Sequence, residues 1–271
     1  MGSKIFFRKI TLAHAENIPK DKPVILIANH QNAMLDPVML CWMLPRQLHW
    51  LTRADLFKKP FVNKLLRSIN MLPVYRERDK VADLKGVNNE TFDECNLRLK
   101  NNQLMCMFPE GTHRGKKKLV PLKKGVARIA INAVESGLDD LCILPVGLNY
   151  ESFYNYRTSL LAKVGQPISV KDIIAPYSNP AQAQNALLGA VRDALKTVMI
   201  DIEHEDVYEE ILDLEPLCNK LSGSTRLVEQ FDYYHRTVQS INADTATHAP
   251  LKAIAQPYLQ LHNELQIEEK H

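Results

Sequence analysis

Short runs of apolar or alternating residues recur along most of the chain, and segments of helical period separate them. Such runs, bounded by polar or turn residues, are typical of strands. Because strands that alternate with helices form parallel sheets through crossover connections, the pattern predicts an α/β fold. The predicted strands are Ile10–His14, Val24–Ala28, Leu48–Thr52, Met71–Tyr75, Gln103–Phe108, Leu141–Asn149 and Leu160–Gly165. The predicted helices between them are Pro37–Leu44, Ala54–Ser68, Val81–Lys100 and Lys124–Ser136.

Near-continuous apolar strands such as "CILPVGL" fit a sheet that is covered on both faces. We therefore expect a mixed, largely parallel central sheet of about seven strands flanked by helices, with a C-terminal helical appendage. The pattern changes near Pro180, where one long helical segment begins, and acidic helices follow Glu205 with breaks near Ser222–Ser224 and Ala249–Pro250. This change divides the chain into an α/β domain, residues 1–178, and a helical extension, residues 179–271.

Charge is distributed unevenly along the chain, although the net charge is only +3. Residues 46–128 contain 19 Lys or Arg against 8 Asp or Glu, whereas residues 201–271 contain 5 against 14. A basic middle predicts an anionic partner, which could be a phosphate, an anionic membrane surface or an acidic protein. Clustered but ordinary solvated helix faces are the alternative. The same partners would repel the acidic segment, which we expect to face elsewhere.

No apolar run reaches the roughly 18 residues that a membrane-crossing helix needs, and the first residues lack the pattern of a secretory signal. Five cysteines without a C-x-x-C pair predict reduced thiols in the cytosol and no zinc site. We expect a cytoplasmic protein. We expect neither a metal nor a nucleic-acid partner, and the pattern leaves the oligomeric state open.

Polar residues follow several predicted strands, at the edge where α/β sheets bind ligands. His30 comes shortly after the strand that ends at Ala28, and Asp36 follows six residues later. A histidine with an ordinary pKa near 6.5 suits a general base, and a carboxylate can orient it. The alternative is structural: Asp36 before Pro37 has the pattern of a helix N-cap, and His30 could be an ordinary loop residue.

A second polar segment, "FPEGTHRGKKKLVPLKKG", follows the strand that ends at Phe108. Gly111 would let backbone N–H groups approach an anion, and Thr112 and Arg114 could bind it. The alternative is a solvated basic loop, since the Walker A pattern is absent. The carboxylate of Glu110 does not itself help to bind an anion. It could accept a hydrogen bond from a hydroxylated substrate or anchor an arginine.

Other catalytic patterns are missing from the sequence, including G-x-S-x-G, H-E-x-x-H and G-x-G-x-x-G. A His–Asp pair without a Ser or Cys nucleophile favours direct attack by an activated substrate hydroxyl. A thioester is a suitable acyl donor for such attack, because a thiol with a pKa of about 8.5 leaves with little acid assistance.

These segments resemble the glycerolipid acyltransferases that use glycerol-3-phosphate or 1-acyl-glycerol-3-phosphate (lysophosphatidate). Four blocks of that family have counterparts here in the same order, and the segment from Val146 to Val170 resembles bacterial and fungal members acting on glycerol phosphate. The spacer between the histidine and the aspartate has five residues where four are usual. The four blocks are Asn29-His30 with Asp36, "MLPVYR" ending at Arg76, "FPEGT" at Phe108–Thr112, and "ILPV" at Ile143–Val146.

The resemblance implies that His30 deprotonates the acceptor hydroxyl and that Asp36 orients His30. It implies further that the headgroup phosphate is held by Arg76, Glu110, Gly111 and Thr112, with Arg114 in the place of a usual neighbouring arginine. Acyl-CoA or acyl carrier protein would be the co-substrate, without a resident cofactor. A membrane surface would be a partner, with the protein associated peripherally with the inner face of the membrane. Two alternatives remain open, an O-acyltransferase for a lyso-aminolipid and a non-catalytic lipid-binding protein.

Overall fold

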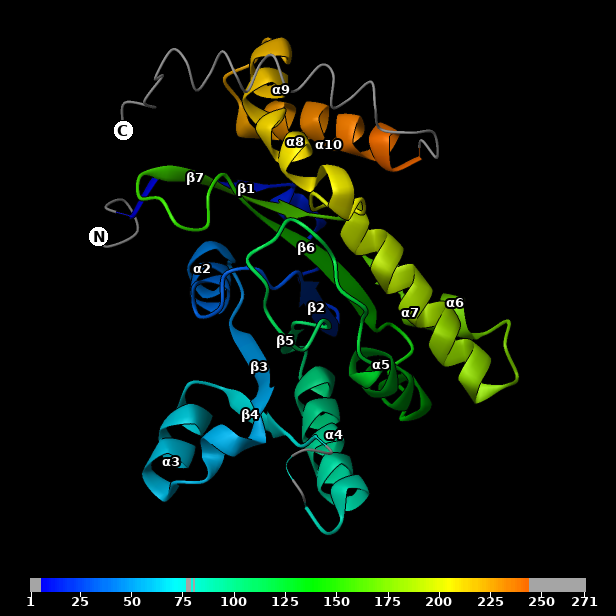
Figure 1. Ribbon diagram of the computed structural model, residues 1–271. Coiled ribbons are helices and arrows are strands. Elements are labelled where there is room, and N and C mark those ends of the chain that lie inside the picture. The colour runs from blue at the N-terminus through cyan, green and yellow to red at the C-terminus, as the bar shows by residue number, and fades with distance from the viewer. Residues whose placement is uncertain (1–5, 77–78, 80, 244–271) are drawn as a thin grey trace.

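The computed structural model describes residues 6–76, 79 and 81–243, and within them eight strands form a single sheet (Figure 1). The spatial order is β1-β7-β6-β2-β5-β3-β4, and β8 pairs with β6 beside this path. Every predicted strand occurs, and the two-residue β8 is an addition. The strands are β1 Phe7–Ala13, β2 Val24–Ala28, β3 Leu48–Arg53, β4 Met71–Val74, β5 Leu104–Met107, β6 Cys142–Tyr150, β7 Thr158–Val164 and β8 Ile168–Ser169.

The central strands all point the same way. β2 runs parallel to β5 and β6, and β3 runs parallel to β4 and β5. β7 is antiparallel to β6 and parallel to β1, so the sheet is mixed but largely parallel, which confirms the predicted fold class. The C-terminal ends of β2 to β6 consequently meet along one edge, which we call the carboxyl edge. Ligands of open α/β sheets bind at such an edge.

Helices cover both faces of the sheet, and the strand order decides which face each helix covers. α2 (Leu35–Met43) leads from β2 to β3, and α3 (Pro60–Ser68) leads from β3 to β4, so both connections step the same way. Right-handed crossovers therefore put α2 and α3 on one face. The connections through α4 (Leu84–Lys100) and α5 (Gly125–Glu135) step back and put these helices on the opposite face.

Alternate residues of β2 supply the two cores that result. Leu26 packs in the same cluster as Met39 and Leu40 of α2, whereas Ile25 packs in the cluster of Ala130 of α5. All of these side chains are buried. This is why the β2 sequence is apolar without a break, and it fixes the direction in which the chain leaves β2 at the carboxyl edge.

The predicted helix at Ala54–Ser68 is divided in two. A short 3-10 helix, η2 (Ala54–Phe57), precedes α3, which begins at Pro60. Proline is favourable at the first helical position, while the residue before it avoids helical geometry. Lys59 accordingly has an extended backbone. The division buries Phe57 and leaves Phe61 exposed.

The long helical segment that was predicted to begin near Pro180 ends at Lys196. α7 (Pro180–Lys196) packs against α5 and β6 with Leu187, Val191 and Leu195, so it forms part of the layer over the sheet (Figure 1). Beyond it the chain runs beside β6, where Asn149 Nδ2 donates to Val198 O at 2.9 Å. The predicted division of the chain at residue 178 stays a prediction.

The acidic helices form a separate cluster over β1 and β7, drawn in yellow and orange in Figure 1. Gly223, with a φ of 66°, lies in the predicted break at Ser222–Ser224. The predicted break at Ala249–Pro250 lies outside the described residues. No helix in the described part of the chain is both long and apolar enough to cross a membrane. The remaining helices are η1 Ala15–Asn17, α6 Val170–Ile174, η4 Glu205–Val207, α8 Tyr208–Asp213, α9 Glu215–Leu221 and α10 Leu227–Ala243.

Candidate active site

His30 and Asp36 lie together at the carboxyl edge, where β2 ends and α2 begins. Nδ1 of His30 is 2.9 Å from Oδ2 of Asp36. An ionised carboxylate only accepts hydrogen bonds, so Nδ1 carries the proton and donates it to Asp36. Nε2 is then the ring nitrogen that can accept a proton. The longer spacer of five residues therefore still allows the loop to fold back.

Asp36 is completely buried, and its carboxylate organises the loop that precedes it. Besides the His30 ring, Oδ2 accepts the backbone N–H of Gln31 at 2.9 Å and that of Asn32 at 2.8 Å. The N-cap prediction is wrong, because α2 begins at Leu35 and Asp36 lies inside its first turn. The carboxylate binds loop amides on its N-terminal side, and those bonds hold the His30 loop closed.

Tyr150, at the end of β6, supplies a further partner of Asp36. Its hydroxyl donates to Oδ1 at 2.7 Å, so both carboxylate oxygens are used. Burial raises the pKa of Tyr150 well above its ordinary value, and the neighbouring Asp36 adds to this shift. The phenol therefore stays neutral and keeps its proton for the carboxylate. The sequence prediction did not include Tyr150, although alternation along β6 places it on the face of Leu148, toward α2.

Asn29 was predicted only as part of the first sequence block, without a role in the site. It is buried and forms two hydrogen bonds with the backbone of Leu148 in β6, through Oδ1 at 2.7 Å and Nδ2 at 3.0 Å. The side-chain amide thus replaces a pair of backbone groups where β2 stops. This pairing fixes the chain at the residue immediately before His30.

Aromatic rings hold the imidazole from its sides. The ring of Phe108, which directly follows β5, stacks on His30 with centroids 4.0 Å apart and an interplanar angle of 10°. Phe108 is in turn stacked on Trp50, and His113 approaches the imidazole edge-on at 5.5 Å. The side chain of His30 remains 17% exposed. The ring is therefore fixed in orientation and still open to a substrate.

Glu110 has a different position from the one expected of a substrate ligand. It is buried, and it accepts the backbone N–H of His30 at 2.7 Å through Oε1 and that of Val120 at 3.2 Å through Oε2. Burial raises its pKa to about 7. Both oxygens bind backbone amides, so the carboxyl group joins the His30 loop to the loop after β5 and contacts neither an arginine nor an open surface.

The rest of the FPEGT segment forms an exposed turn beside His30. Gly111 has a φ of 67°, in the left-handed region that favours glycine, and its N–H donates to Phe108 O at 3.1 Å. Thr112 and Arg114 are exposed, and the Arg114 N–H donates to His30 O at 3.3 Å. The turn therefore places Thr112 and Arg114 in a loop that is bonded to the backbone of His30.

Arg76 lies farther along the carboxyl edge than the other predicted residues. It follows β4, three strands from β2, which corresponds to roughly 14 Å at the usual strand spacing. Its guanidinium is bonded to Asp79 at 3.3 Å and to Asp55 at 3.2 Å. The structure thus gathers His30, Asp36, Glu110, Gly111, Thr112 and Arg114, while Arg76 is paired with two carboxylates.

The basic loop after Arg114 binds the acidic helices, which corrects the prediction that the acidic segment faces elsewhere. Lys116 and Lys118 form ion pairs with Glu205 at 3.2 and 2.9 Å. Lys117 is buried and paired with Glu215, and its backbone N–H donates to the Tyr208 hydroxyl at 2.7 Å. Three lysines of the basic segment, for which an external anion was predicted as the partner, are therefore paired with glutamates of the same chain.

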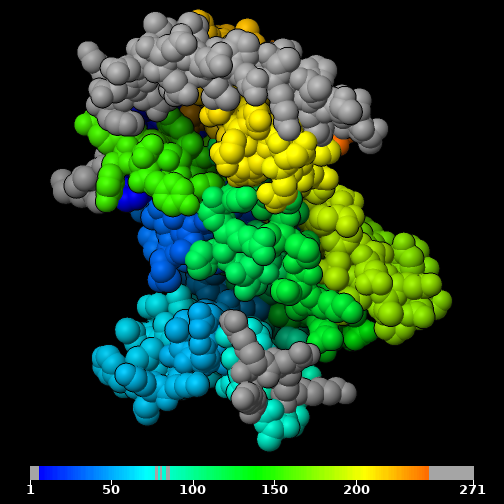
Figure 2. All heavy atoms as spheres, in the orientation of Figure 1, coloured from blue at the N-terminus to red at the C-terminus, as the bar shows by residue number. Residues whose placement is uncertain are grey.

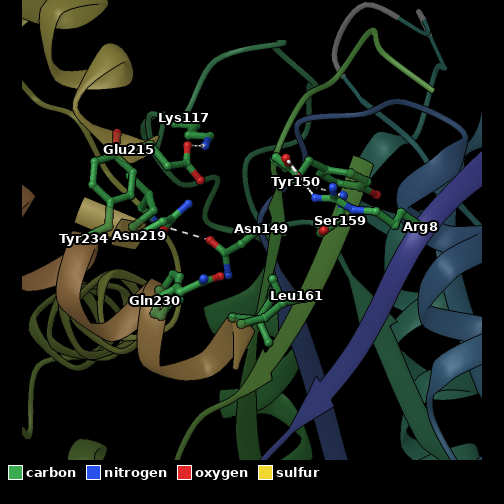
Figure 3. A pocket seen from close by; sticks show the side chains of 14 residues that line it. Arg8, Lys117, Asn149, Tyr150, Ser159, Leu161, Glu215, Asn219, Gln230 and Tyr234 are labelled. Carbon is green, nitrogen blue, oxygen red and sulfur yellow. Dashed lines mark hydrogen bonds and ion pairs between the residues drawn. The ribbon is translucent and has the colours of Figure 1, made fainter. Parts of the chain in front are cut away.

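These contacts lie in the seam between the sheet and the C-terminal helices, shown in Figure 3. Lys117 and Glu215 face one another there, beside a cavity of about 180 Å³ whose lining also includes Tyr150 and Tyr234. His30 is not part of that lining. The cavity therefore does not include the candidate base, and the seam connects the acidic helices to the loop that carries Arg114.

Comparison with known proteins matches these features to one family. Residues 9–149, which include the cluster around His30, match the sequence profile of the family described as Acyltransferase. Glycerol-3-phosphate O-acyltransferase 1 of Saccharomyces cerevisiae is 32% identical over 152 residues, covering 50% of this chain and 20% of that protein. The 1-acyl-sn-glycerol-3-phosphate acyltransferase of Borreliella burgdorferi is 29% identical, covering 69% of this chain and 70% of that protein.

The corresponding Bacillus subtilis protein is 27% identical, covering 45% of this chain and 56% of its own length. Among solved structures, the 1-acyl-sn-glycerophosphate acyltransferase PlsC of Thermotoga maritima is similar at 25% identity and a TM-score of 0.46, covering 70% of this chain and 71% of that one. The chain spans between a fifth and just over half of the length of the yeast and Bacillus relatives. Because the family profile matches residues 9–149, which is more than half of the chain, the chain belongs to the acyltransferase family.

Proposed function

We propose that the protein is an O-acyltransferase of phospholipid synthesis with His30 as its general base. It transfers an acyl group from a thioester, acyl-CoA or acyl carrier protein, to a hydroxyl of lysophosphatidate or glycerol-3-phosphate. One observation carries the proposal: buried Asp36 holds the Nδ1–H of His30, which leaves Nε2 as the nitrogen that can accept a proton, on a side chain that is 17% exposed. A base oriented in this way has the arrangement that general-base catalysis requires.

The proposed reaction proceeds through a tetrahedral intermediate. Nε2 of His30 takes the proton of the acceptor hydroxyl while that oxygen attacks the carbonyl carbon of the thioester. The intermediate collapses by breaking the C–S bond, and the imidazolium returns the proton to the departing thiolate. The products are the new ester and a free thiol, and His30 is neutral again. Asp36 stabilises the imidazolium while it carries the positive charge.

The acceptor phosphate is assigned to the turn beside His30. Thr112 offers a hydroxyl and Arg114 a guanidinium, and both residues are exposed in the turn that is bonded to the backbone of His30. An arginine suits a phosphate because its N–H groups can bind two oxygens at once. Glu110 instead positions the backbone of His30. The binding of phosphate by Arg76 stays a prediction, which would require Arg76 to exchange a carboxylate partner for the ligand.

The names of the relatives support a phosphorylated acceptor, since they mention glycerol-3-phosphate and 1-acyl-sn-glycerol-3-phosphate. Both molecules combine a free hydroxyl with a phosphate on a glycerol unit, which suits a base beside an anion-binding turn. A lyso-aminolipid lacks that phosphate. It is kept as the second enzymatic candidate, and lipid binding without turnover is kept as the non-enzymatic one.

The test is release of free thiol by the purified full chain, with acyl-CoA or acyl carrier protein as donor. The acceptors are glycerol-3-phosphate, lysophosphatidate and lyso-aminolipids, and we expect turnover with a phosphorylated one. His30→Asn should lower kcat by at least ~10²-fold, on the scale of a lost general base. The matched control is His14→Asn, an exposed histidine whose φ of 58° asparagine tolerates.

Each outcome decides between the candidates. Undiminished turnover by a folded His30→Asn variant would refute the proposed base. Turnover with lyso-aminolipids alone would refute the acceptor but leave the base intact. Lipid binding without thiol release from any donor would favour the non-catalytic alternative.

A further inference from the structure

Two rows of exposed apolar side chains lie on the helices that cover one face of the sheet. Within each row the residues are four positions apart, so they share one side of their helix. The row on α2 is Met34, Val38 and Trp42, and the row on α3 is Phe61, Leu65 and Ile69. We call these six residues the apolar rows. The exposed fraction is 57% for Trp42 and 78% for Phe61, which is unusual for such large apolar side chains.

The helices carry these rows away from the sheet on the same side of the molecule. α2 buries Met39 and Leu40 against the sheet, and its row occupies the opposite side. Right-handed connections put α3 on the same face as α2. Figure 2 shows both segments, in blue and cyan, at the surface on the same side of the molecule. Large apolar side chains that are exposed together on one side of a protein mark an interaction site.

The charge around the rows indicates the chemistry of the partner. Residues 56–69 contain four cations and no carboxylate. Lys58, Lys59 and Lys64 are exposed, and no described carboxylate lies within ion-pair distance of them. The acid nearest to the α2 row in sequence, Asp36, is buried. Apolar helix faces bordered by lysines bind anionic lipid surfaces, where each lysine adds an attraction.

We infer that the apolar rows dock the protein on an anionic lipid surface, with His30 beside the contact. The inference rests on the proposed function insofar as that function supplies a lipid substrate. Met34 precedes α2 directly, and Asp36 in the first turn of α2 holds His30. A surface that receives the α2 row therefore lies next to the base. An acidic protein would satisfy the lysines, but six apolar side chains on two helices match a continuous apolar phase better.

Trp42 allows docking to be measured without turnover. The chain has two tryptophans, and Trp50 is only 4% exposed, so a change in emission on adding vesicles reports Trp42. We expect a blue shift with vesicles of phosphatidylcholine and phosphatidylglycerol, and quenching when their chains are brominated. Phosphatidylcholine vesicles should produce a weaker response, and salt should weaken the binding to anionic vesicles.

Substitutions in the α3 row test the surface itself. Phe61→Ser with Leu65→Ser should lower the vesicle partition coefficient at least about tenfold, because two inserted side chains are lost. The matched control is Leu97→Ser with Leu221→Ser, two exposed leucines on α4 and α9. With glycerol-3-phosphate and a short-chain acyl-CoA, both double variants should keep the rate of the unsubstituted protein.

The two proposals fail separately in these experiments. His30→Asn should bind vesicles like the unsubstituted protein, so loss of turnover leaves the docking result intact. Undiminished vesicle binding by Phe61→Ser with Leu65→Ser would overturn the inference. So would an absence of vesicle binding by the unsubstituted protein, binding of the rows to acyl carrier protein in place of vesicles, or self-association through the rows in sedimentation experiments.

Discussion

The hydroxyl of Tyr150 donates to Oδ1 of Asp36 at 2.7 Å, and the two residues lie 114 positions apart in the sequence. The bond joins the C-terminal end of β6 to the first turn of α2. The His30 ring and two loop amides also donate to Asp36, so the buried carboxylate accepts hydrogen bonds from four groups. Hydrogen bonding of this kind favours the charged form of a buried carboxyl group, which is the form that stabilises an imidazolium.

Tyr150→Phe removes this donor while it keeps the ring. Oδ1 of Asp36 is then left buried without a partner, which costs about 1–3 kcal/mol in the free energy of unfolding. We expect a lower melting temperature and a kcat reduced about tenfold, since 1.4 kcal/mol corresponds to that factor. Tyr156→Phe, at an exposed tyrosine, is the control. Equal kcat values in the two variants would show that Asp36 does not depend on the phenol.

The sequence predicted the strands well because burial on both faces leaves a local pattern. It could not predict Tyr150 as a partner of Asp36, because that contact depends on β6 lying beside β2. The paired residues of these two strands, such as Val24 and Cys142, are 118 positions apart and meet only in the assembled sheet. The neighbours His30 and Asp36 could be identified because one loop connects them, and only the alternative role of Asp36 as an N-cap is wrong.

Glu110 shows a second limit of sequence interpretation. Its residue type and position suggested a ligand, but its role depends on which backbone amides approach it after folding. Lysines 116–118 show a third limit. A count of charges along the sequence considers each segment by itself and does not show which segments meet in the folded chain. In the folded chain two acidic residues, Glu205 and Glu215, neutralise part of the basic loop at contact distance.

Glu110→Gln should flatten the dependence of stability on pH. Burial raises the pKa of Glu110 from 4.5 to about 7, so the folded protein keeps a proton that the unfolded chain releases in this interval. The free energy of unfolding therefore falls as pH rises from 4.5 to 7, by about 3 kcal/mol from this group, and stays lower above pH 7.

The measurement is urea unfolding of both proteins between pH 4 and pH 8. The difference between the two curves should change across the interval from pH 4.5 to 7 and be constant outside it. Glu90→Gln, at an exposed glutamate of α4, should give a curve parallel to that of the unsubstituted protein. A parallel curve for Glu110→Gln as well would contradict the raised pKa.

Glu215→Gln should loosen the loop that carries Arg114. Lys117 is buried, so removing its partner leaves an uncompensated charge, at a cost of about 3–5 kcal/mol. Because the backbone of Lys117 is bonded to Tyr208, we expect the C-terminal helices and the loop to open together, which would raise KM for the phosphorylated acceptor more than it lowers kcat.

Hydrogen exchange of α8 to α10 and steady-state kinetics test this coupling. Asp139→Asn, which breaks the exposed ion pair with Lys171, should change stability by less than about 1 kcal/mol and leave KM unchanged. Replacing both buried partners, Lys117→Met with Glu215→Leu, should restore most of the stability. Faster exchange without any change in KM would mean that the helices and the loop are independent.

Gly147→Ala should prevent the C-terminal half from packing on the sheet. A Cβ at this position of β6 would lie 1.8 Å from the backbone oxygen of Val198, and backbone cannot move aside as a flexible side chain can. Asn149 Nδ2 also binds that oxygen at 2.9 Å, so a shift of the segment would break a further bond. We expect a loss of about 3 kcal/mol or more in the free energy of unfolding, measured with urea.

Gly125→Ala is the control, since no atom lies within 4 Å of its Cβ position, and there alanine should stabilise α5 by about 0.5–1 kcal/mol. If both substitutions had small effects, the chain after α7 would not lie against β6 in solution.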